Sequence, residues 1–256
     1  MSRKVTLVVF NEIDICDWKL GNKYSIEYTV YSLKKYKSKI LQENSEYILF
    51  WDARNSLPTV DILNKVLESK GDLWHIGAEL GLNDAIPLLD FVQPTSMLNL
   101  NIDSSIEHSS WKHTFKGSLM KFNVFKEIEL SNYSNSMDII GLDFGYKAMK
   151  SGVITRYLPL FFKDKTVKVS IRLKKKEQLL FIRNNLDTKA FFWCYLLSFF
   201  KISPFSFFKA YKKKGKYTEV VYKQNVNSSD VLKGKNLTVS IVIATLERYP
   251  YLEKEL

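Results

Sequence analysis

Apolar and polar positions along the chain predict an alternation of short buried strands and amphipathic helices. Continuous apolar runs rich in β-branched and aromatic residues predict strands at Val5–Phe10 and Ile48–Trp51. Apolar residues at helical spacing predict helices at Ser25–Lys37, Thr59–Ser69 and Met137–Lys150. The succession of these elements predicts an α/β domain of about 160 residues.

Weaker patterns predict further strands and helices between and after these elements. Leu73–Ile76 has the composition of a short strand, and Gly117–Lys126 that of a strand with the turn after it. Val153–Phe162 also predicts a strand, and Pro159 places its far end at a sheet edge or outside the sheet. A further helix is predicted at Lys174–Asn185.

The second predicted strand ends abruptly in an acidic residue. Asp52 follows the run Ile48–Trp51 directly, and a turn containing Asn55 and Pro58 comes next. Ligands of open α/β sheets collect at the carboxyl ends of strands, which favours a functional role for Asp52. A polar side chain before a helix is also a common helix cap, and the hydrophobic pattern leaves both interpretations open.

Composition identifies an ordinary globular protein with one unusual region. The 256 residues are 46% hydrophobic and 25% charged, which excludes a wholly disordered chain. Between Lys163 and Lys216 there are fifteen Lys and Arg but three acidic residues, a local excess of +12 against +11 for the whole chain. The basic character therefore belongs to this segment and needs a local explanation.

Cysteine and histidine spacing indicates no metal or redox motif. Cys16 and Cys194 lie far apart, which predicts free thiols in a reducing compartment. His108 and His113 do not have the spacing of a zinc site. The apolar part of the amino terminus is too short for a signal peptide, so we expect a cytoplasmic protein.

The basic segment contains an aromatic-rich stretch, Ala190–Phe208, interrupted by Lys201 and Pro204. Ten uncharged residues separate Ala190 from Lys201, fewer than the roughly 20 that span a bilayer. One interpretation is an interfacial helix on an anionic membrane surface, peripheral at the inner membrane face; another is packing against the α/β domain or a partner. Nucleic acid is not expected, because the aromatic residues form a block and do not alternate with basic ones. The candidate surface lysines are Lys201, Lys209, Lys212, Lys213 and Lys214.

Three segments between residues 45 and 160 together resemble a known family. The first is Ile48–Pro58, in which Asp52 is followed by Ala-Arg54-Asn-Ser-Leu-Pro58, a helix and then Gly71-Asp72-Leu73. The second is Gly117–Ile128, and the third is Ile140–Gly152 with Tyr157-Leu-Pro159. Their order and separations resemble the family 2 glycosyltransferases of the GT-A fold, whose central strand ends in Asp-any-Asp and Leu-any-Pro. That family also has an acceptor-side strand and a helix running from Glu-Asp toward Gly-Tyr-Arg.

The resemblance implies transfer of a sugar from a nucleotide-sugar donor to a glycan or lipid-linked acceptor. In such enzymes the Asp-any-Asp motif holds Mg²⁺ or Mn²⁺ against the donor diphosphate. A carboxylate of the Glu-Asp pair takes the proton of the acceptor hydroxyl. The fold it implies is a GT-A-like (Rossmann-like) mixed sheet flanked by helices.

The sequence departs from the family pattern at both chemical positions. Asp52 matches the first metal-side aspartate, whereas Arg54 stands at the second, so Asp52 and Arg54 are the candidate donor-binding residues and a Mg²⁺ or Mn²⁺ site is incomplete. The Glu-Asp pair falls on Ile140-Gly141, and Asp143 is the candidate catalytic residue nearby. We therefore expect a degenerate domain with a binding or regulatory role. The non-enzymatic alternative is a membrane-surface scaffold or acceptor-recognition module.

The end of the chain resembles the start of a second such domain. Val239-Ser-Ile-Val-Ile243, Thr245 and Arg248 are similar to the family's opening strand, with Glu247 where the family has Asn. The expected organisation is a degenerate domain at 1–165, a basic helical connector and linker at 166–236, and a truncated second domain at 237–256. We accordingly expect the chain to be a fragment of a longer glycosyltransferase.

Overall fold

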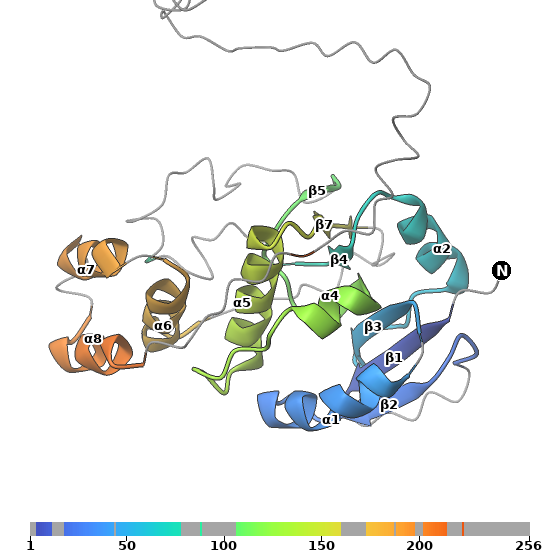
Figure 1. Ribbon diagram of the computed structural model, residues 1–256, viewed down its shortest axis with the longest axis horizontal. Helices are drawn as coiled ribbons and strands as arrows, with labels where there is room; N and C mark the ends of the chain where they lie inside the picture. The colour runs from blue at the N-terminus through green and yellow to red at the C-terminus, as the bar shows by residue number, and fades with distance from the viewer. Residues whose placement is uncertain are drawn as a thin grey trace, which may run out of the picture. The chain divides into compact units, whose positions relative to one another are not determined.

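The computed structural model describes residues 4–11, 18–43, 45–77, 88, 106–159, 173–186, 188–197, 202–213 and 222 (Figure 1). Contacts divide the chain into two units, Met1–Lys223 and Gln224–Leu256, and every described residue belongs to the first. The described strands form a seven-stranded mixed sheet flanked by helices. The predicted α/β class is therefore confirmed, and the arrangement is Rossmann-like.

The sheet is mostly parallel, with two antiparallel strands. Its strand order is β2-β1-β3-β6-β4-β7-β5. β6 runs antiparallel to both neighbours and β5 antiparallel to β7, while the remaining pairs are parallel. The carboxyl ends of β1, β3 and β4 therefore lie at the same edge as the beginning of β6. The strands are β1 Val5–Phe10, β2 Lys23–Ile26, β3 Tyr47–Asp52, β4 Leu73–His75, β5 His108–Ser109, β6 Gly117–Lys121 and β7 Thr155–Tyr157.

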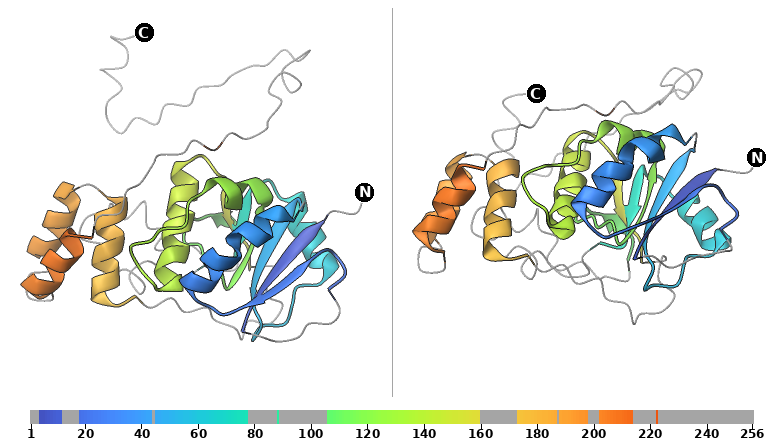
Figure 2. Two further views of the ribbon diagram at one scale, coloured as in Figure 1. Left: turned by 60° about the horizontal axis from the view of Figure 1, so that its bottom comes forward. Right: turned by 90° about the horizontal axis from the view of Figure 1, so that it is seen from below.

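Helices cover both faces of this sheet and add a further layer beside it. Side chains of α1, α4 and α5 pack on one face, and those of α2 pack on the other. α6 packs against α5, and α7 and α8 pack against α6, farther from the sheet (Figure 2). The helices are α1 Val30–Gln42, α2 Val60–Glu68, α4 Phe122–Glu127, α5 Met137–Lys150, α6 Lys175–Asn185, α7 Thr188–Leu197 and α8 Pro204–Tyr211.

The central strands are apolar throughout because both of their faces are covered. Along β1, Val8 and Phe10 face the cluster under α1 and α5, while Leu7 and Val9 face the cluster under α2. β3 divides in the same way, with Phe50 on the first face and Trp51 on the second. This two-sided burial is what the continuous apolar runs in the sequence predict.

The predicted helix at Ser25–Lys37 is wrong at its beginning. Residues 23–26 instead form β2, parallel to β1, and Ile26 is buried as part of a strand. The helix begins at Val30 because the Thr29 side chain accepts a hydrogen bond from the Ser32 backbone N–H, a helix cap. The spacing of Ile26 and Val30 fits one helical turn but spans a strand, a turn and a cap.

The segment after the β6 strand also differs from the prediction. Gly117–Lys126 is predicted as a strand with a following turn, but the strand ends at Lys121 and α4 begins at Phe122. Val124 and Phe125 of this short helix are buried in the core beside β3. The residues predicted as a turn after this strand therefore form a helix that covers the sheet.

The segment before β6 lies very close to α5 because α5 carries a glycine there. A Cβ atom on Gly145 would stand 2.3 Å from the Trp111 carbonyl oxygen and 2.5 Å from the His113 Cβ. Any larger residue at Gly145 would push the helix away from this segment. The close approach fixes the position of α5 relative to the segment before β6, and both contribute to the site described next.

Aromatic contacts join the outer helices to this core. Phe181 of α6 stacks on Trp111 at 5.7 Å between ring centroids and meets the ring of Tyr146 in α5 edge-on. Phe191 of α7 stacks on Phe207 of α8 at 4.6 Å. The aromatic residues of the basic segment thus supply an internal core for α6–α8, in addition to any outward role.

Candidate functional site

The site forms where two of the sequence-predicted segments meet at one sheet edge. Asp52 is the last residue of β3, and its backbone N–H donates to the Lys116 carbonyl oxygen at 2.9 Å. Gly117 at the start of β6 pairs with Trp51. Asn11, which follows β1 at the same edge, has a left-handed backbone with φ 69°, a conformation that asparagine tolerates. Backbone geometry alone therefore gathers the ends of three strands here.

Arg54 forms a bidentate ion pair with Asp52. Arg54 Nε donates to Oδ1 at 2.9 Å, and Nη2 donates to Oδ2 at 2.5 Å. The backbone N–H of Arg54 also donates to Oδ1 at 3.0 Å, which fixes the tight turn after β3. The Asp52 side chain is 4% exposed and that of Arg54 is 69% exposed. The carboxylate is therefore held inside while most of the guanidinium remains open to solvent.

Two opposed effects act on the Asp52 carboxyl. Burial would raise the pKa of Asp52, but hydrogen bonds from the side chain and backbone of Arg54, with the charges of Arg54 and Lys116, outweigh it. The net result is a pKa below the ordinary value of 3.8. The same pairing raises the pKa of Arg54. Asp52 is thus ionised, and Arg54 already neutralises it.

A tyrosine, a lysine and a second aspartate complete the group. Asp138, in the first turn of α5, accepts hydrogen bonds from Lys116 Nζ at 2.9 Å and from the Tyr28 hydroxyl at 3.1 Å. Lys116 also lies over the Tyr28 ring, 5.0 Å from its centroid. Burial and the neighbouring charge of Asp138 raise the pKa of Tyr28 well above its ordinary value, so this hydroxyl remains a donor. We call the five residues the carboxyl-edge cluster: Tyr28, Asp52, Arg54, Lys116 and Asp138.

The arrangement of the cluster does not fit a divalent cation. Mg²⁺ and Mn²⁺ require several oxygen ligands, whereas Asp52 already binds Arg54 and Asp138 binds Lys116. Among the described residues, no group of three or more His, Cys, Asp or Glu side chains is placed to hold a metal ion. The cluster offers instead two cationic side chains, each oriented by a carboxylate.

Asp143, the candidate catalytic residue, lies in a different environment. Its side chain is 0% exposed and forms an ion pair with Lys147 at 2.8 Å between Oδ2 and Nζ. Tyr133 and Asn185 donate to Oδ1 at 2.9 and 2.8 Å, and Ser131 donates to Oδ2. This network joins α5, the segment before it and α6. A carboxylate enclosed in this way has no access to a substrate hydroxyl.

Two histidine side chains are also buried in the domain. The rings of His75 and His113 lie 5.8 Å apart, and both residues are fully buried. Burial lowers the pKa of His75 to about 4 and that of His113 well below 6.5, so both are neutral. His113 bonds to the Gly141 carbonyl oxygen and to Ser118, which makes it a structural residue of the β6–α5 contact.

The candidate surface lysines are only partly described. Lys209 lies on α8, and Lys212 and Lys213 follow directly after it, all exposed. Lys201 and Lys214 lie outside the described residues, as does Cys16. Cys194 is a buried free thiol on α7. The described lysines therefore belong to α8 and the residues directly after it, and none of them is a member of the carboxyl-edge cluster.

The sequence analysis names Asp52 and Arg54 as candidates but does not name the other three members of the cluster. Tyr28 precedes a helix cap, Lys116 precedes a strand and Asp138 follows the α5 cap, so each is a polar residue at an element boundary. That boundary position, at the same end of the sheet as Asp52, is the one signal the sequence carries for them.

The chain was compared with protein families, curated proteins and solved structures: no family model, curated protein or solved structure matches it.

Proposed function

We propose that this domain binds the diphosphate of a nucleotide-sugar at the carboxyl-edge cluster and takes part in sugar transfer to a glycan or lipid-linked acceptor. The proposal joins the resemblance to family 2 glycosyltransferases with the geometry of the sheet edge. In this proposal the domain is a binding or regulatory module of the transferase.

One observation carries the proposal. The three segments of the resemblance are separated by long stretches of chain, yet polar residues within the first and just before the other two lie together: Asp52 and Arg54 after β3, Lys116 before β6 and Asp138 in the first turn of α5. The same edge is where ligands of open α/β sheets bind. A motif resemblance by chance would not require these residues to meet.

Arg54 and Lys116 supply the chemistry for an anionic ligand. A guanidinium presents paired N–H donors that match phosphate oxygens, and most of the Arg54 side chain is accessible. Asp52 sets the direction of the guanidinium, and Asp138 does the same for the Lys116 ammonium. No step of this binding passes through a metal ion, because the cluster does not fit one.

A second candidate function is sugar transfer by this domain itself. Asp138 favours it, because this carboxylate is 22% exposed and lies in the cluster, whereas Asp143 is enclosed. Asp138 could accept the proton of an acceptor hydroxyl if that hydroxyl displaced Lys116 or Tyr28.

Thermal unfolding with nucleotides tests the binding proposal. A nucleoside diphosphate at about 100 times its Kd should stabilise the chain by about 2.7 kcal/mol, which raises Tm by roughly 5–10 °C for a unit of this size. UDP, GDP and ADP and their sugar conjugates should each be measured with and without Mn²⁺. We expect a shift with one of them that does not need Mn²⁺.

Variants at two arginines localise the effect. Arg54→Ala should abolish the shift, and Arg156→Ala, on β7 beside Glu107, should retain it. Absence of a shift with every nucleotide in the unaltered chain would overturn the proposal. For the second candidate, release of nucleoside diphosphate from the donor should be lost in Asp138→Asn and kept in Asp61→Asn, an exposed aspartate of α2.

A further inference from the structure

The two outermost helices expose large apolar side chains to solvent. Phe205 and Phe208 of α8 are 77% and 60% exposed, and Trp193 and Leu196 of α7 are 54% and 62% exposed. Globular proteins do expose single apolar residues, but a group of this size on two adjacent helices indicates a binding surface. The group lies in the layer farthest from the sheet (Figure 2).

On α7 the exposed residues form one stripe. Lys189, Phe192, Trp193 and Leu196 follow one another at intervals of three, one and three residues, which places them on one helix face. Phe191 and Cys194 are buried on the opposite face. The stripe therefore points away from the buried face of α7, although the Phe192 ring at its margin also contacts Phe207 and Tyr211 of α8.

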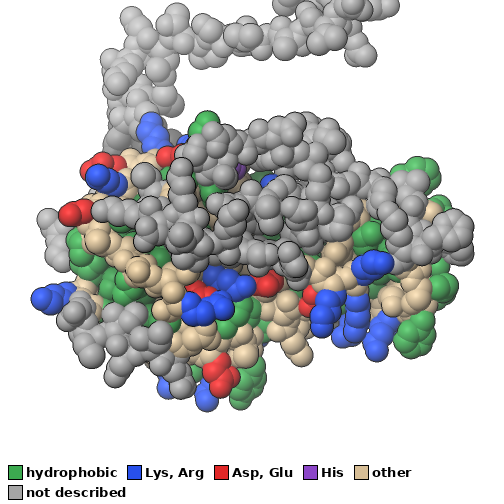
Figure 3. Space-filling model, turned by 180° about the vertical axis from the view of Figure 1, so that it is seen from behind, with side chains coloured by type: hydrophobic (Ala, Val, Ile, Leu, Met, Phe, Trp, Pro, Cys, Tyr) green, Lys and Arg blue, Asp and Glu red, His purple; other side chains and the backbone are tan. Residues whose placement is uncertain are grey.

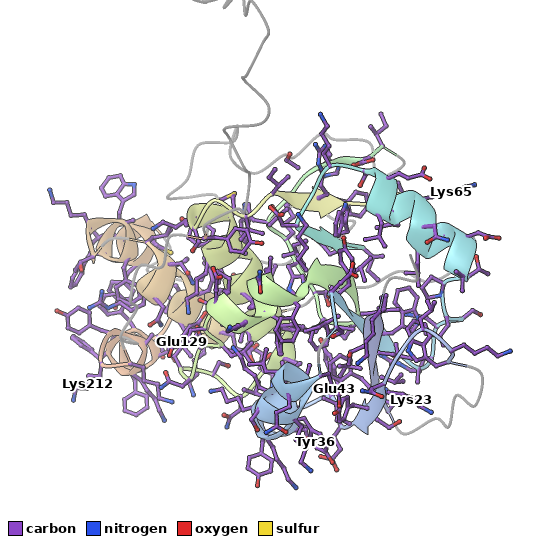
Figure 4. All side chains as sticks on the ribbon, turned by 45° about the vertical axis from the view of Figure 1, so that its right-hand side comes forward. Lys23, Tyr36, Glu43, Lys65, Glu129 and Lys212 are labelled. Carbon is purple, nitrogen blue, oxygen red and sulfur yellow. The ribbon has the colours of Figure 1, made fainter. Side chains whose placement is uncertain are left out.

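α8 repeats the same arrangement. Phe205, Phe208, Lys209 and Lys212 are exposed, again at intervals of three, one and three residues. Phe207 and Ala210 are buried on the opposite face, and Lys209 lies 5.9 Å from the centroid of the Phe205 ring. Figure 4 shows Lys212 pointing outward from this helix. Each helix thus carries aromatic rings and lysines together on its outward face.

The charge of this surface has one sign. Between Thr188 and Lys216 the sequence contains seven lysines and no Asp or Glu. Figure 3 shows hydrophobic and Lys or Arg side chains side by side at this end of the unit. A surface that is both aromatic and exclusively basic is complementary to a partner that is both apolar and anionic.

We propose that the outward faces of α7 and α8 dock on an anionic lipid bilayer, with the aromatic rings in the interface and the lysines at the headgroups. An anionic membrane surface offers both complements at once, apolar chains and negative headgroups. No described helix is long and apolar enough to cross a membrane. The docking surface is separate from the carboxyl-edge cluster and does not depend on it.

Vesicle co-sedimentation of the full chain tests this proposal. Vesicles of phosphatidylcholine mixed equally with phosphatidylglycerol should bind the chain, and vesicles of phosphatidylcholine alone should bind it far less. Because each lysine near an anionic surface strengthens binding roughly fivefold, Lys209→Ala with Lys212→Ala should weaken it roughly 30-fold. Raising the salt concentration should weaken it as well.

Matched variants on α1 separate a specific surface from general positive charge. Lys35→Ala with Lys39→Ala removes the same charge from another exposed face and should leave binding nearly unchanged. In the same way, Phe208→Ala should weaken binding, while Tyr31→Ala, at an exposed aromatic residue of α1, should not. Equal losses in both pairs of variants would contradict docking through α7 and α8.

Tryptophan fluorescence gives an independent readout. Of the five tryptophans, Trp193 is exposed, Trp18 is partly buried, and Trp51, Trp74 and Trp111 are buried, so the largest emission change on binding should come from Trp193. We expect a shift to shorter wavelength with anionic vesicles that is absent in Trp193→Phe. The proposal is overturned if vesicles do not bind, or if the chain instead forms a dimer that Phe208→Ala dissociates, since a second copy would then occupy the surface.

Discussion

Two buried aspartates of this domain each pair with a nearby basic residue, yet their surroundings differ. Asp52 pairs with Arg54 at a sheet edge, and the partner is 69% exposed. Asp143 pairs with Lys147 between helices, where the two side chains are 0% and 11% exposed. The first pair can exchange its partner for a ligand, while the second is enclosed by further hydrogen bonds. Pairing alone therefore does not identify a site; access to the cation, together with a position at the carboxyl edge of the sheet, favours the first pair.

The largest expected effect is the loss of the enclosed charge. Asp143→Asn leaves Lys147 charged and buried without its counterion, so we expect the free energy of unfolding to fall by about 3–5 kcal/mol. The contacts with Tyr133 and Asn185 weaken as well, which loosens α6 from α5. Urea unfolding followed by circular dichroism measures the change.

An exposed aspartate provides the control for that measurement. Asp61→Asn, in the first turn of α2, should change the free energy of unfolding by at most about 0.5 kcal/mol. A loss below about 1 kcal/mol for Asp143→Asn would show that the network around it is not a structural anchor.

The second prediction concerns acid and the enclosed histidines. The pKa of His75 is about 4 in the fold against 6.5 ordinarily, and that of His113 is also lowered, so the unfolded chain binds more protons below pH 6.5. Stability should therefore fall as the pH drops from 6.5 to 4, by up to about 1.4 kcal/mol per pH unit from His75, and His113 adds a contribution of the same sign. Urea unfolding at a series of pH values measures this slope.

A histidine substitution tests which imidazole ring causes this dependence of stability on pH. His75→Gln should reduce the slope by about the equivalent of one proton. Asp52 does not contribute in this range, because its pKa lies below 3.8 and the stability from its ion pair is lost only in stronger acid. An unaltered slope in His75→Gln would contradict the assignment.

The sequence predicts the fold better than it predicts the site. Continuous apolar runs identify β1 and β3 because strands buried on both faces need them. The strand β2 is missed because Ile26 and Val30 fit helical spacing, although the Thr29 cap separates them. Local periodicity cannot distinguish one helix from a strand, a turn and a helix in succession.

The sequence analysis names Asp143 and leaves Asp138 unnamed for a similar reason. The two residues are five positions apart on α5, which places them on different helix faces, about 140° apart. Asp138 faces Lys116 and the sheet edge, whereas Asp143 faces α6 through Asn185. Which face meets the edge depends on how α5 packs, and the close approach at Gly145 that decides it is a tertiary contact.

The smallest effect on stability, and the most informative about the site, is expected from Asp52→Asn. An asparagine still accepts the Arg54 backbone N–H, and the Arg54 side chain whose pairing it weakens is largely exposed and can be solvated, so we expect a loss of about 1 kcal/mol, well below that for Asp143→Asn. Nucleotide binding should persist and become tighter, because the cluster gains one net positive charge and Arg54 is released toward the ligand. Binding through a metal ion on Asp52 would give the opposite result, with Asp52→Asn abolishing the thermal shift and Arg54→Ala preserving it. The two variants measured side by side therefore decide whether arginine or metal neutralises the diphosphate.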